Sequence, residues 1–213
     1  MKIFLKTFLD FLKTSKLIKS LLFVDLTFFG SWSLINPIFS VFIVQKIEGG
    51  NVAVAGVSIA IYTITFSIFR FLTASFLDSK KGQEDEFWSL FYGLLFLSFC
   101  SFLYLFVRYP SHLFFLQFFQ GIAMAMYYAG YFGIYLRSLP KEKEGTAYSL
   151  DVALTNLIGG VSILFGGTIA YTFGFKTVFV LVGIFTFLSA IFSLRILKEI
   201  SPHSFKKIKF FPF

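Results

Sequence analysis

Cysteine, histidine and charge are scarce in this 213-residue chain, and each scarcity excludes a class of function. Cys100 is the only cysteine, so the chain can form neither an internal disulfide nor a cysteine-based metal site. The two histidines, His112 and His203, belong to no cluster with metal-ligand spacing. Charged residues make up 14% of the chain, whereas a soluble domain carries about a quarter. The composition therefore argues against a metal centre and against a soluble fold.

Motifs for nucleotide binding and catalysis are also missing. No G-x-x-x-x-G-K-[ST] segment occurs, so we expect no ATP site of the P-loop type on this chain. Gly-Val-Ser-Ile occurs at Gly56 and again at Gly160, and it resembles the G-x-S-x of intramembrane serine proteases. Neither histidine is placed to face such a serine from another span. We therefore expect no enzymatic activity and no cofactor.

Apolar residues, by contrast, form 57% of the sequence and give a mean hydropathy of +0.80. They fall into six runs of about 20 residues, the length of a helix that crosses the hydrocarbon core of a bilayer. Backbone groups in lipid must find partners within their own segment, so each run is expected to be a helix. The sequence thus predicts an all-α, polytopic membrane protein with spans near 21–44, 52–77, 87–107, 113–136, 146–172 and 178–197.

Lysine and arginine are distributed unevenly between the two ends of these runs. Of the 19 basic residues, fifteen flank the ends on one side, three flank the other side, and Arg70 lies within a run. Because basic loops are retained in the cytoplasm, both termini are predicted to be cytoplasmic and the protein to lie in the cell (inner) membrane. The net charge is +8, and the basic residues are expected to contact anionic membrane lipids. We expect no nucleic acid partner.

Basic, aromatic segments flank the predicted six-helix domain, which covers residues 20–198. Residues 1–19 place lysines at helical spacing among Phe and Leu, which predicts an amphipathic helix in the cytoplasmic interface. No small-residue cleavage site follows them, so they do not resemble a signal peptide. Residues 199–213 predict a basic cytoplasmic tail that contacts the membrane surface.

Ionisable residues within the spans are costly in lipid, which makes them candidates for function. Three occur: Asp25 in the first span, Arg70 in the second and Asp151 in the fifth. One interpretation is a structural ion pair between Arg70 and either aspartate, and the other is a role in gating or proton coupling. The third and sixth spans contain none, so we expect those two spans to face lipid.

Amide and aromatic side chains near the middle of two spans predict a polar cavity. Trp32 and Asn36 share one face of the first span, and the proline that follows Asn36 should kink this helix. Gln117, Gln120 and Tyr127 follow one face of the fourth span. These five residues are expected to contact a substrate by hydrogen bonds and stacking. A second interpretation, in which the amides hydrogen bond to one another, stays open.

The end of the second span resembles a loop motif of the major facilitator superfamily, which reads G-x-x-x-D-R-x-G-R-K in outline. The segment here is Ala74-Ser-Phe-Leu-Asp78-Ser-Lys80-Lys81-Gly82. It keeps the aspartate and the basic pair, but it has alanine for the first glycine, lacks the arginine, and places the later glycine one residue late. The Gly- and Ala-rich fourth span and the paired glycines of the fifth extend the resemblance over nearly the whole chain.

The resemblance implies both a fold and a mechanism. Six helices of this superfamily form a 3+3 inverted repeat, and two such halves make a transporter with its site near the midplane. Helices 1 and 4 of each half line the cavity, and helices 2 and 5 form the seam between the halves. The chain is then a half-size secondary transporter that moves a small solute by alternating access as a homodimer. Asp78 and Lys81 would belong to its cytoplasmic gate.

Two alternatives stay open beside this interpretation. A membrane-embedded substrate-binding subunit that depends on a separate ATPase partner also fits six short-looped helices. The chain is otherwise one half of a heterodimeric transporter. The residues select no substrate, direction or coupling ion, since amides, Tyr and Trp suit neutral polar solutes as well as lipophilic drugs.

Overall fold

The computed structural model describes residues 15–80, 82–139, 141, 144–202 and 204, and these residues contain helices and no strand. Lys81, most of the predicted N-terminal amphipathic helix and most of the basic tail lie outside the described residues. The helices are α2 (Lys16–Trp32), α3 (Phe39–Lys46), α4 (Val52–Asp78), α5 (Gln83–Leu103), η1 (Tyr104–Phe106), α6 (Pro110–Ser138), α7 (Glu144–Phe173) and α8 (Phe175–Ile200).

Five of these helices, α4 to α8, are long and apolar enough to cross a membrane, with α5 continued by η1. They coincide with the second to sixth runs of the sequence. The prediction of an all-helical, polytopic membrane protein is therefore confirmed. The first run is divided between α2 and α3, so a sixth span stays a prediction.

The break between α2 and α3 lies at residues 33–38, where the chain forms consecutive turns. Pro37 has no N–H and therefore cannot donate a hydrogen bond to the carbonyl four residues before it. Around Pro37 the backbone forms tighter turns, in which the N–H of Ile35 donates to the carbonyl of Trp32 at 3.1 Å and the N–H of Ile38 donates to the carbonyl of Ile35 at 3.0 Å. The predicted kink at the Asn36–Pro37 pair is confirmed, and it extends over more than one turn.

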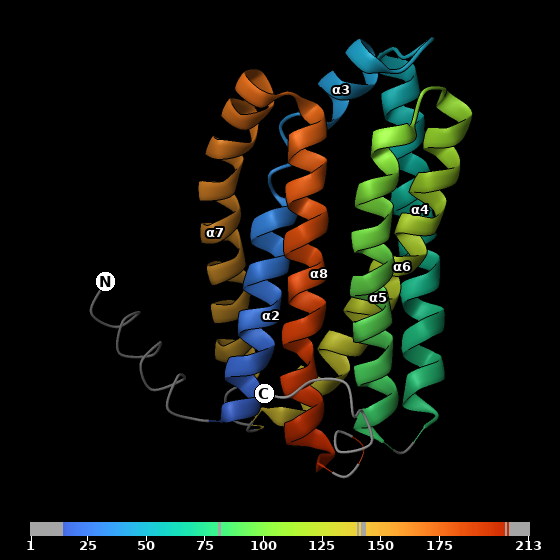
Figure 1. Cartoon of the computed structure of the whole chain (residues 1–213). Coiled ribbons are helices and arrows are strands. Elements are labelled where there is room, and N and C mark those ends of the chain that lie inside the picture. The colour runs from blue at the N-terminus through green and yellow to red at the C-terminus, as the bar shows by residue number, and fades with distance from the viewer. Residues whose placement is uncertain (1–14, 81, 140, 142–143, 203, 205–213) are drawn as a thin grey trace.

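The helices pack as two groups of three, with α4, α5 and α6 in one and α2, α7 and α8 in the other (Figure 1). The two groups meet mainly along α5 and α8. The two groups have similar internal contacts. In one group the helix of the first run, α2, packs against α7 and α8. In the other group the helix of the fourth run, α6, packs in the same way against α4 and α5. The α7–α8 contact has no counterpart of similar size between α4 and α5.

Glycines on α6 allow this helix to approach both of its neighbours closely. A Cβ atom at Gly121 would lie 2.9 Å from Cβ of Thr65 on α4. A Cβ atom at Gly130 would meet the backbone of Leu90 on α5. Small residues at such crossings bring membrane helices into backbone contact. This close packing fixes the depth at which the polar side chains of α6 lie between the two groups.

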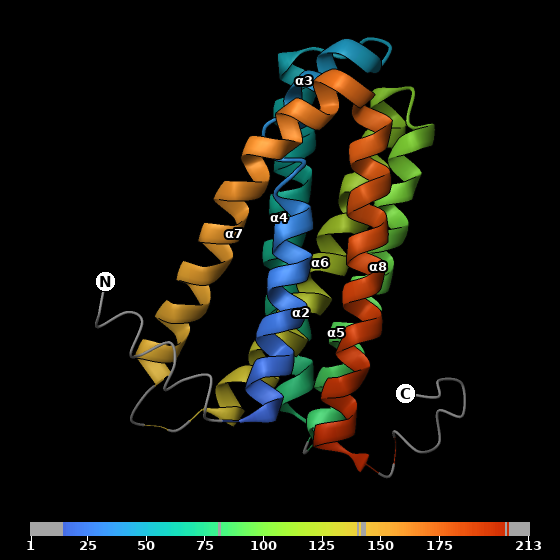
Figure 2. The ribbon, with the colours of Figure 1, turned by 60° about the vertical axis from the view of Figure 1, so that its left-hand side comes forward.

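The third and sixth spans, α5 and α8, were expected to face lipid, but within this chain they are more buried than α4 and α7. In the most apolar stretches of α5 and α8, 50% and 44% of the residues are buried, against 17% in α4 and 11% in α7. The reason is that α5 and α8 join the two groups, whereas α4 and α7 lie on the outside. Figure 2 shows α7 leaning away from the other helices towards its N-terminal end. Within this chain, α4 and α7 thus present the most open faces.

The first and last described helices approach the same end of the bundle. α2 begins there and α8 ends there, in both views (Figures 1 and 2). An even number of crossings places both ends of a chain on one side of a membrane. The arrangement agrees with the predicted location of the termini, which stays a prediction.

Candidate functional site

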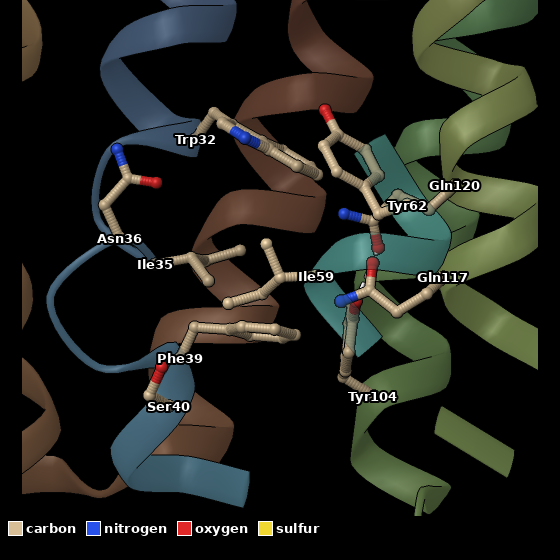
Figure 3. Close-up of a pocket in the computed structure, with 10 residues that line it drawn as sticks. All are labelled: Trp32, Ile35, Asn36, Phe39, Ser40, Ile59, Tyr62, Tyr104, Gln117 and Gln120. Atoms are coloured by element: carbon tan, nitrogen blue, oxygen red, sulfur yellow. Dashed lines mark hydrogen bonds between the residues drawn. The ribbon is translucent and has the colours of Figure 1, made fainter. Parts of the chain in front are cut away.

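A pocket of about 210 Å³ lies between the broken first run, α4 and α6 (Figure 3). Its lining is aromatic and aliphatic, with several amide and hydroxyl groups and no charged side chain. The lining residues are Trp32, Ile35, Asn36, Phe39, Ser40, Ile59, Tyr62, Tyr104, Gln117 and Gln120. Such a lining binds by stacking, apolar contact and a few hydrogen bonds.

Four of the five predicted cavity residues line this pocket. Trp32 and Asn36 come from the chain around the break, and Gln117 and Gln120 come from α6. The pocket also contains Tyr62 of α4, which the sequence analysis did not select. The signal that would have found it is a tyrosine hydroxyl in the middle of an apolar run, where it needs a polar neighbour.

The two glutamines of the pocket differ in their hydrogen bonding. The hydroxyl of Tyr104 donates to Oε1 of Gln120 at 2.5 Å, and both residues are buried. The Tyr104 ring is held in place by stacking on Phe179, with ring centroids 4.7 Å apart. Gln117 is only 3% exposed, and its Oε1 has no hydrogen-bond partner among the described residues. One interpretation of the sequence was that the amides hydrogen bond to one another. The two glutamine amides do not do so.

Tyr127, the fifth predicted cavity residue, does not line the pocket. Its hydroxyl donates to Oδ1 of Asp25 on α2. One turn later, the hydroxyl of Tyr131 donates to Oδ1 of Asp151 on α7, at 2.9 Å. The two aspartates are each 3% exposed, and the tyrosines that bind them lie one turn apart on α6. These four residues form a second polar site, here called the aspartate–tyrosine cluster.

The chemistry of this cluster follows from its donors and acceptors. A carboxylate accepts hydrogen bonds, and each aspartate here accepts one from a tyrosine hydroxyl of α6. Two negative charges near each other in an apolar interior repel strongly, and binding of one proton would relieve this repulsion. Because Asp25 and Asp151 come from different helices, a movement of α7 against α2 would change this arrangement.

Arg70 is exposed on α4 and packs against aromatic rings of α4 and α6. Its guanidinium carbon is 4.7 Å from the ring centroid of Tyr128, and the rings of Phe66 and Phe132 lie at 5.6 Å and 5.5 Å. Arg70 takes part in none of the ion pairs found in the described part of the chain. The structural ion pair considered for Arg70 is therefore not formed, and aromatic faces take the place of the carboxylate.

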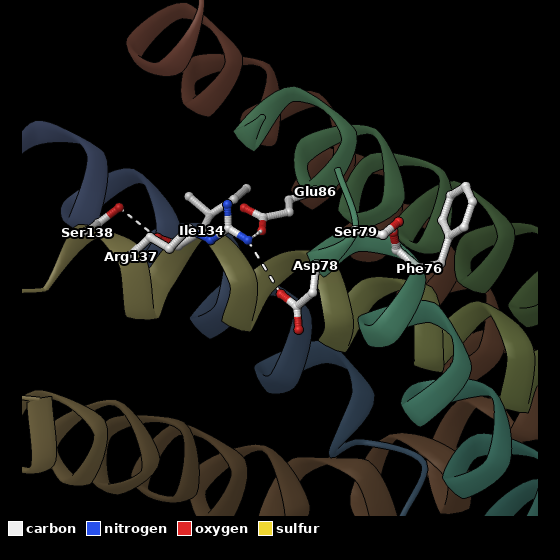
Figure 4. Close-up of polar contacts among 7 residues, drawn as sticks. All are labelled: Phe76, Asp78, Ser79, Glu86, Ile134, Arg137 and Ser138. Atoms are coloured by element: carbon white, nitrogen blue, oxygen red, sulfur yellow. Dashed lines mark hydrogen bonds and ion pairs between the residues drawn. The ribbon is translucent and has the colours of Figure 1, made fainter. Parts of the chain in front are cut away.

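A third polar site joins α4, α5 and α6 at the end of the bundle where α2 begins (Figure 4). Arg137 of α6 contacts Asp78 of α4 at 3.4 Å and Glu86 of α5 at 2.9 Å. The Glu86 side chain is 1% exposed, and Gly133 leaves the space that its carboxylate occupies. Glu86 is not among the site residues predicted from the sequence, because there it is the last residue of an acidic run before the third span.

The sequence profile of the Major Facilitator Superfamily matches residues 21–211. The chain belongs to this superfamily. The resemblance inferred from the loop after the second span is thereby confirmed, and the chain is a multi-pass membrane protein of a transporter family. Three polar sites in this member of a transporter family are therefore candidates for a role in transport: the pocket, the aspartate–tyrosine cluster and the ion pairs of Arg137.

Curated relatives match a smaller part of the chain. The "Multi-drug resistance efflux pump PmrA" of Streptococcus pneumoniae, in strains TIGR4 and R6, is 44% identical over 63 residues. The match covers 29% of this chain and 15% of the pump, so this chain aligns with much less than two thirds of the relatives' length. No solved structure gives a significant match.

Proposed function

We propose that this chain is a six-helix half of a secondary transporter, which moves a small organic solute by alternating access. The observation that carries the proposal is the pocket between the broken first run, α4 and α6. It combines aromatic rings with buried amides at the position where the superfamily places its substrate. The kinked segment between α2 and α3 supplies irregular backbone beside the pocket, which membranes tolerate where it lines a cavity.

The proposed architecture has six spans in a 3+3 inverted repeat, with α2 and α3 together forming the first span. The contact pattern supports it, because exchanging the two triplets of runs maps the main helix pairs onto one another. The shared end of α2 and α8 supports an even number of crossings. The excess of basic residues at that end supports a cytoplasmic location for both termini.

The proposed assembly is a homodimer in which α4 and α7 form the seam. Both helices are barely buried within one chain. Arg70 is exposed on α4, and an arginine that faces hydrocarbon is costly, so this side is expected to face protein or water. The pocket of about 210 Å³ is below the range of about 300–1,000 Å³ for drug-sized ligands, as expected if each copy supplies part of a shared cavity.

The aspartate–tyrosine cluster is the proposed site of proton coupling. Two tyrosine hydroxyls of α6 donate hydrogen bonds to the carboxyl groups of Asp25 and Asp151. The same helix carries the pocket glutamines. In this proposal the two carboxyl groups share one proton, and its release leaves two buried negative charges, which favours separation of α2 and α7. Arg70 is proposed to act in the gate between the halves, and Asp78 with Arg137 in the gate at the cytoplasmic end.

The test is uptake of a fluorescent aromatic cation, ethidium, into proteoliposomes with an imposed pH gradient. We expect gradient-dependent uptake by the wild type and a loss of uptake in Trp32→Ala, because Trp32 supplies a stacking face of the pocket. The matched control is Trp88→Ala on α5, the other tryptophan of the chain, which lies outside this pocket. Uptake that is absent from the wild type, or equal in the two variants, would overturn the proposal.

A further inference from the structure

Gln117 presents an unsatisfied polar atom in the wall of the pocket. Its Oε1 is buried and unpaired, while Gln120, one turn later, accepts a hydrogen bond from Tyr104. Buried amide oxygens in proteins nearly always have a partner, so an exception in a pocket calls for an explanation. The position of Gln117 in the wall of the pocket indicates that the missing partner comes from outside the chain.

The shape of the pocket restricts what that partner can be attached to. Figure 3 shows Trp32, Ile35 and Phe39 on one side, and Tyr62 with the two glutamines and Tyr104 on the other. Aromatic faces bind flat rings by offset stacking and also attract cations. No carboxylate lines the pocket, so a positive charge on the ligand finds no ionic partner there and is not what the pocket recognises.

Water explains how the free pocket tolerates an unpaired amide. A space of about 210 Å³ holds water, which can donate to Oε1 of Gln117 before a ligand arrives. A ligand that displaces this water must replace its hydrogen bond, or the amide loses a partner on binding. A ring without a donor is then penalised, although its apolar contacts are unchanged.

We infer that Gln117 is a specificity-determining residue, which accepts a hydrogen bond from the transported molecule through Oε1. The pocket then selects flat aromatic compounds that carry an N–H or O–H donor beside the ring. This inference rests on the proposed transport function and adds the class of substrate to it.

The test compares two permanent cations that have the same ring system and the same charge. The first is acriflavinium, whose two amino groups carry four N–H donors, and the second is its analogue with all four of these hydrogens replaced by methyl groups. Binding is measured by fluorescence anisotropy with the full chain in lipid nanodiscs, after subtraction of binding to empty nanodiscs. We expect the wild type to bind acriflavinium about tenfold more tightly than the methylated analogue.

Three variants separate the role of the acceptor from a general effect on the pocket. Gln117→Met keeps the side-chain length and removes the amide, so the preference should fall to about onefold. Gln117→Glu keeps an acceptor oxygen and should retain the preference. Gln45→Met, on the exposed part of α3 outside the pocket, is the matched control and should behave as the wild type.

Equal affinity of the wild type for the two probes would overturn the inference, and so would a preserved preference in Gln117→Met. The comparison of probes on the wild type does not depend on the folding of any variant. Uptake of both probes is measured in parallel to separate the two proposals. Equal uptake without discrimination would refute only the role of Gln117, whereas discriminating binding without uptake would refute only the transport function.

Discussion

Replacing Arg137 by methionine tests the ion pairs that join α4, α5 and α6. Arg137 contacts Glu86, whose side chain is 1% exposed, at 2.9 Å, and Asp78, whose side chain is 77% exposed, at 3.4 Å. Removing one partner of a fully buried pair costs about 3–5 kcal/mol, whereas an exposed pair contributes about 0–1 kcal/mol. Because Arg137 is itself 40% exposed, water screens the Glu86 pair. We therefore expect Arg137→Met to lower the free energy of unfolding by about 2 kcal/mol.

The two carboxylates provide matched controls for this prediction. Asp78→Asn removes the exposed partner and should change the free energy of unfolding by less than about 0.5 kcal/mol. Glu86→Gln removes the buried charge that Arg137→Met leaves without a partner. The double variant Glu86→Gln/Arg137→Met should therefore be more stable than Arg137→Met alone, a coupling that a double-mutant cycle measures.

The assay is reversible unfolding of the purified chain in mild detergent by titration with sodium dodecyl sulfate. Tryptophan fluorescence reports the transition, since Trp88 lies two residues from Glu86 on α5. Equal losses for Asp78→Asn and Arg137→Met would refute the reasoning, because they would mean that the difference in burial has no effect. Strict additivity of Glu86→Gln and Arg137→Met would refute it as well.

Two further predictions concern the aspartate–tyrosine cluster and the packing of α6. Asp25→Asn keeps the side-chain shape but removes the carboxyl group, so uptake driven by a pH gradient should be lost while probe binding without a gradient persists. Gly130→Ala should destabilise the chain by about 1–3 kcal/mol in the same detergent titration, because the new Cβ would meet the α5 backbone. Gly160→Ala, which faces open space on α7, should instead stabilise it by about 0.4–1 kcal/mol.

Helical periodicity places side chains on a common face, which explains why four of the predicted cavity residues line one pocket. Gln117 and Gln120 are close in the sequence on one face of α6, and Asn36–Pro37 marked the break that brings Trp32 to the same pocket. Periodicity does not specify depth, however. Tyr127 follows Gln120 on nearly the same face, but it lies about 10 Å further along the helix axis. It therefore meets Asp25 on α2 instead of the pocket.

Other features of the site depend on which helices become neighbours, and local sequence carries no such information. Arg70 is in a span, but only the packing of α4 against α6 shows that it lies over Tyr128 and forms none of the ion pairs of the described residues. Glu86 is buried because Gly133, on another helix, leaves space for it. The openness of α4 and α7 likewise follows from α5 and α8 occupying the junction between the two groups.

The most direct test of the central claim, a half-transporter completed by a second copy, is the mass of the assembled protein. Native mass spectrometry of the chain released from lipid nanodiscs measures this mass and discounts bound lipid. We expect the mass of two identical chains, which contact each other through α4 and α7. Replacing exposed side chains such as Phe71 on α4 and Leu164 on α7 by bulky charged residues should abolish the dimer. A strict monomer that still carries out uptake, or a complex with a soluble ATPase or a different membrane chain, would contradict it.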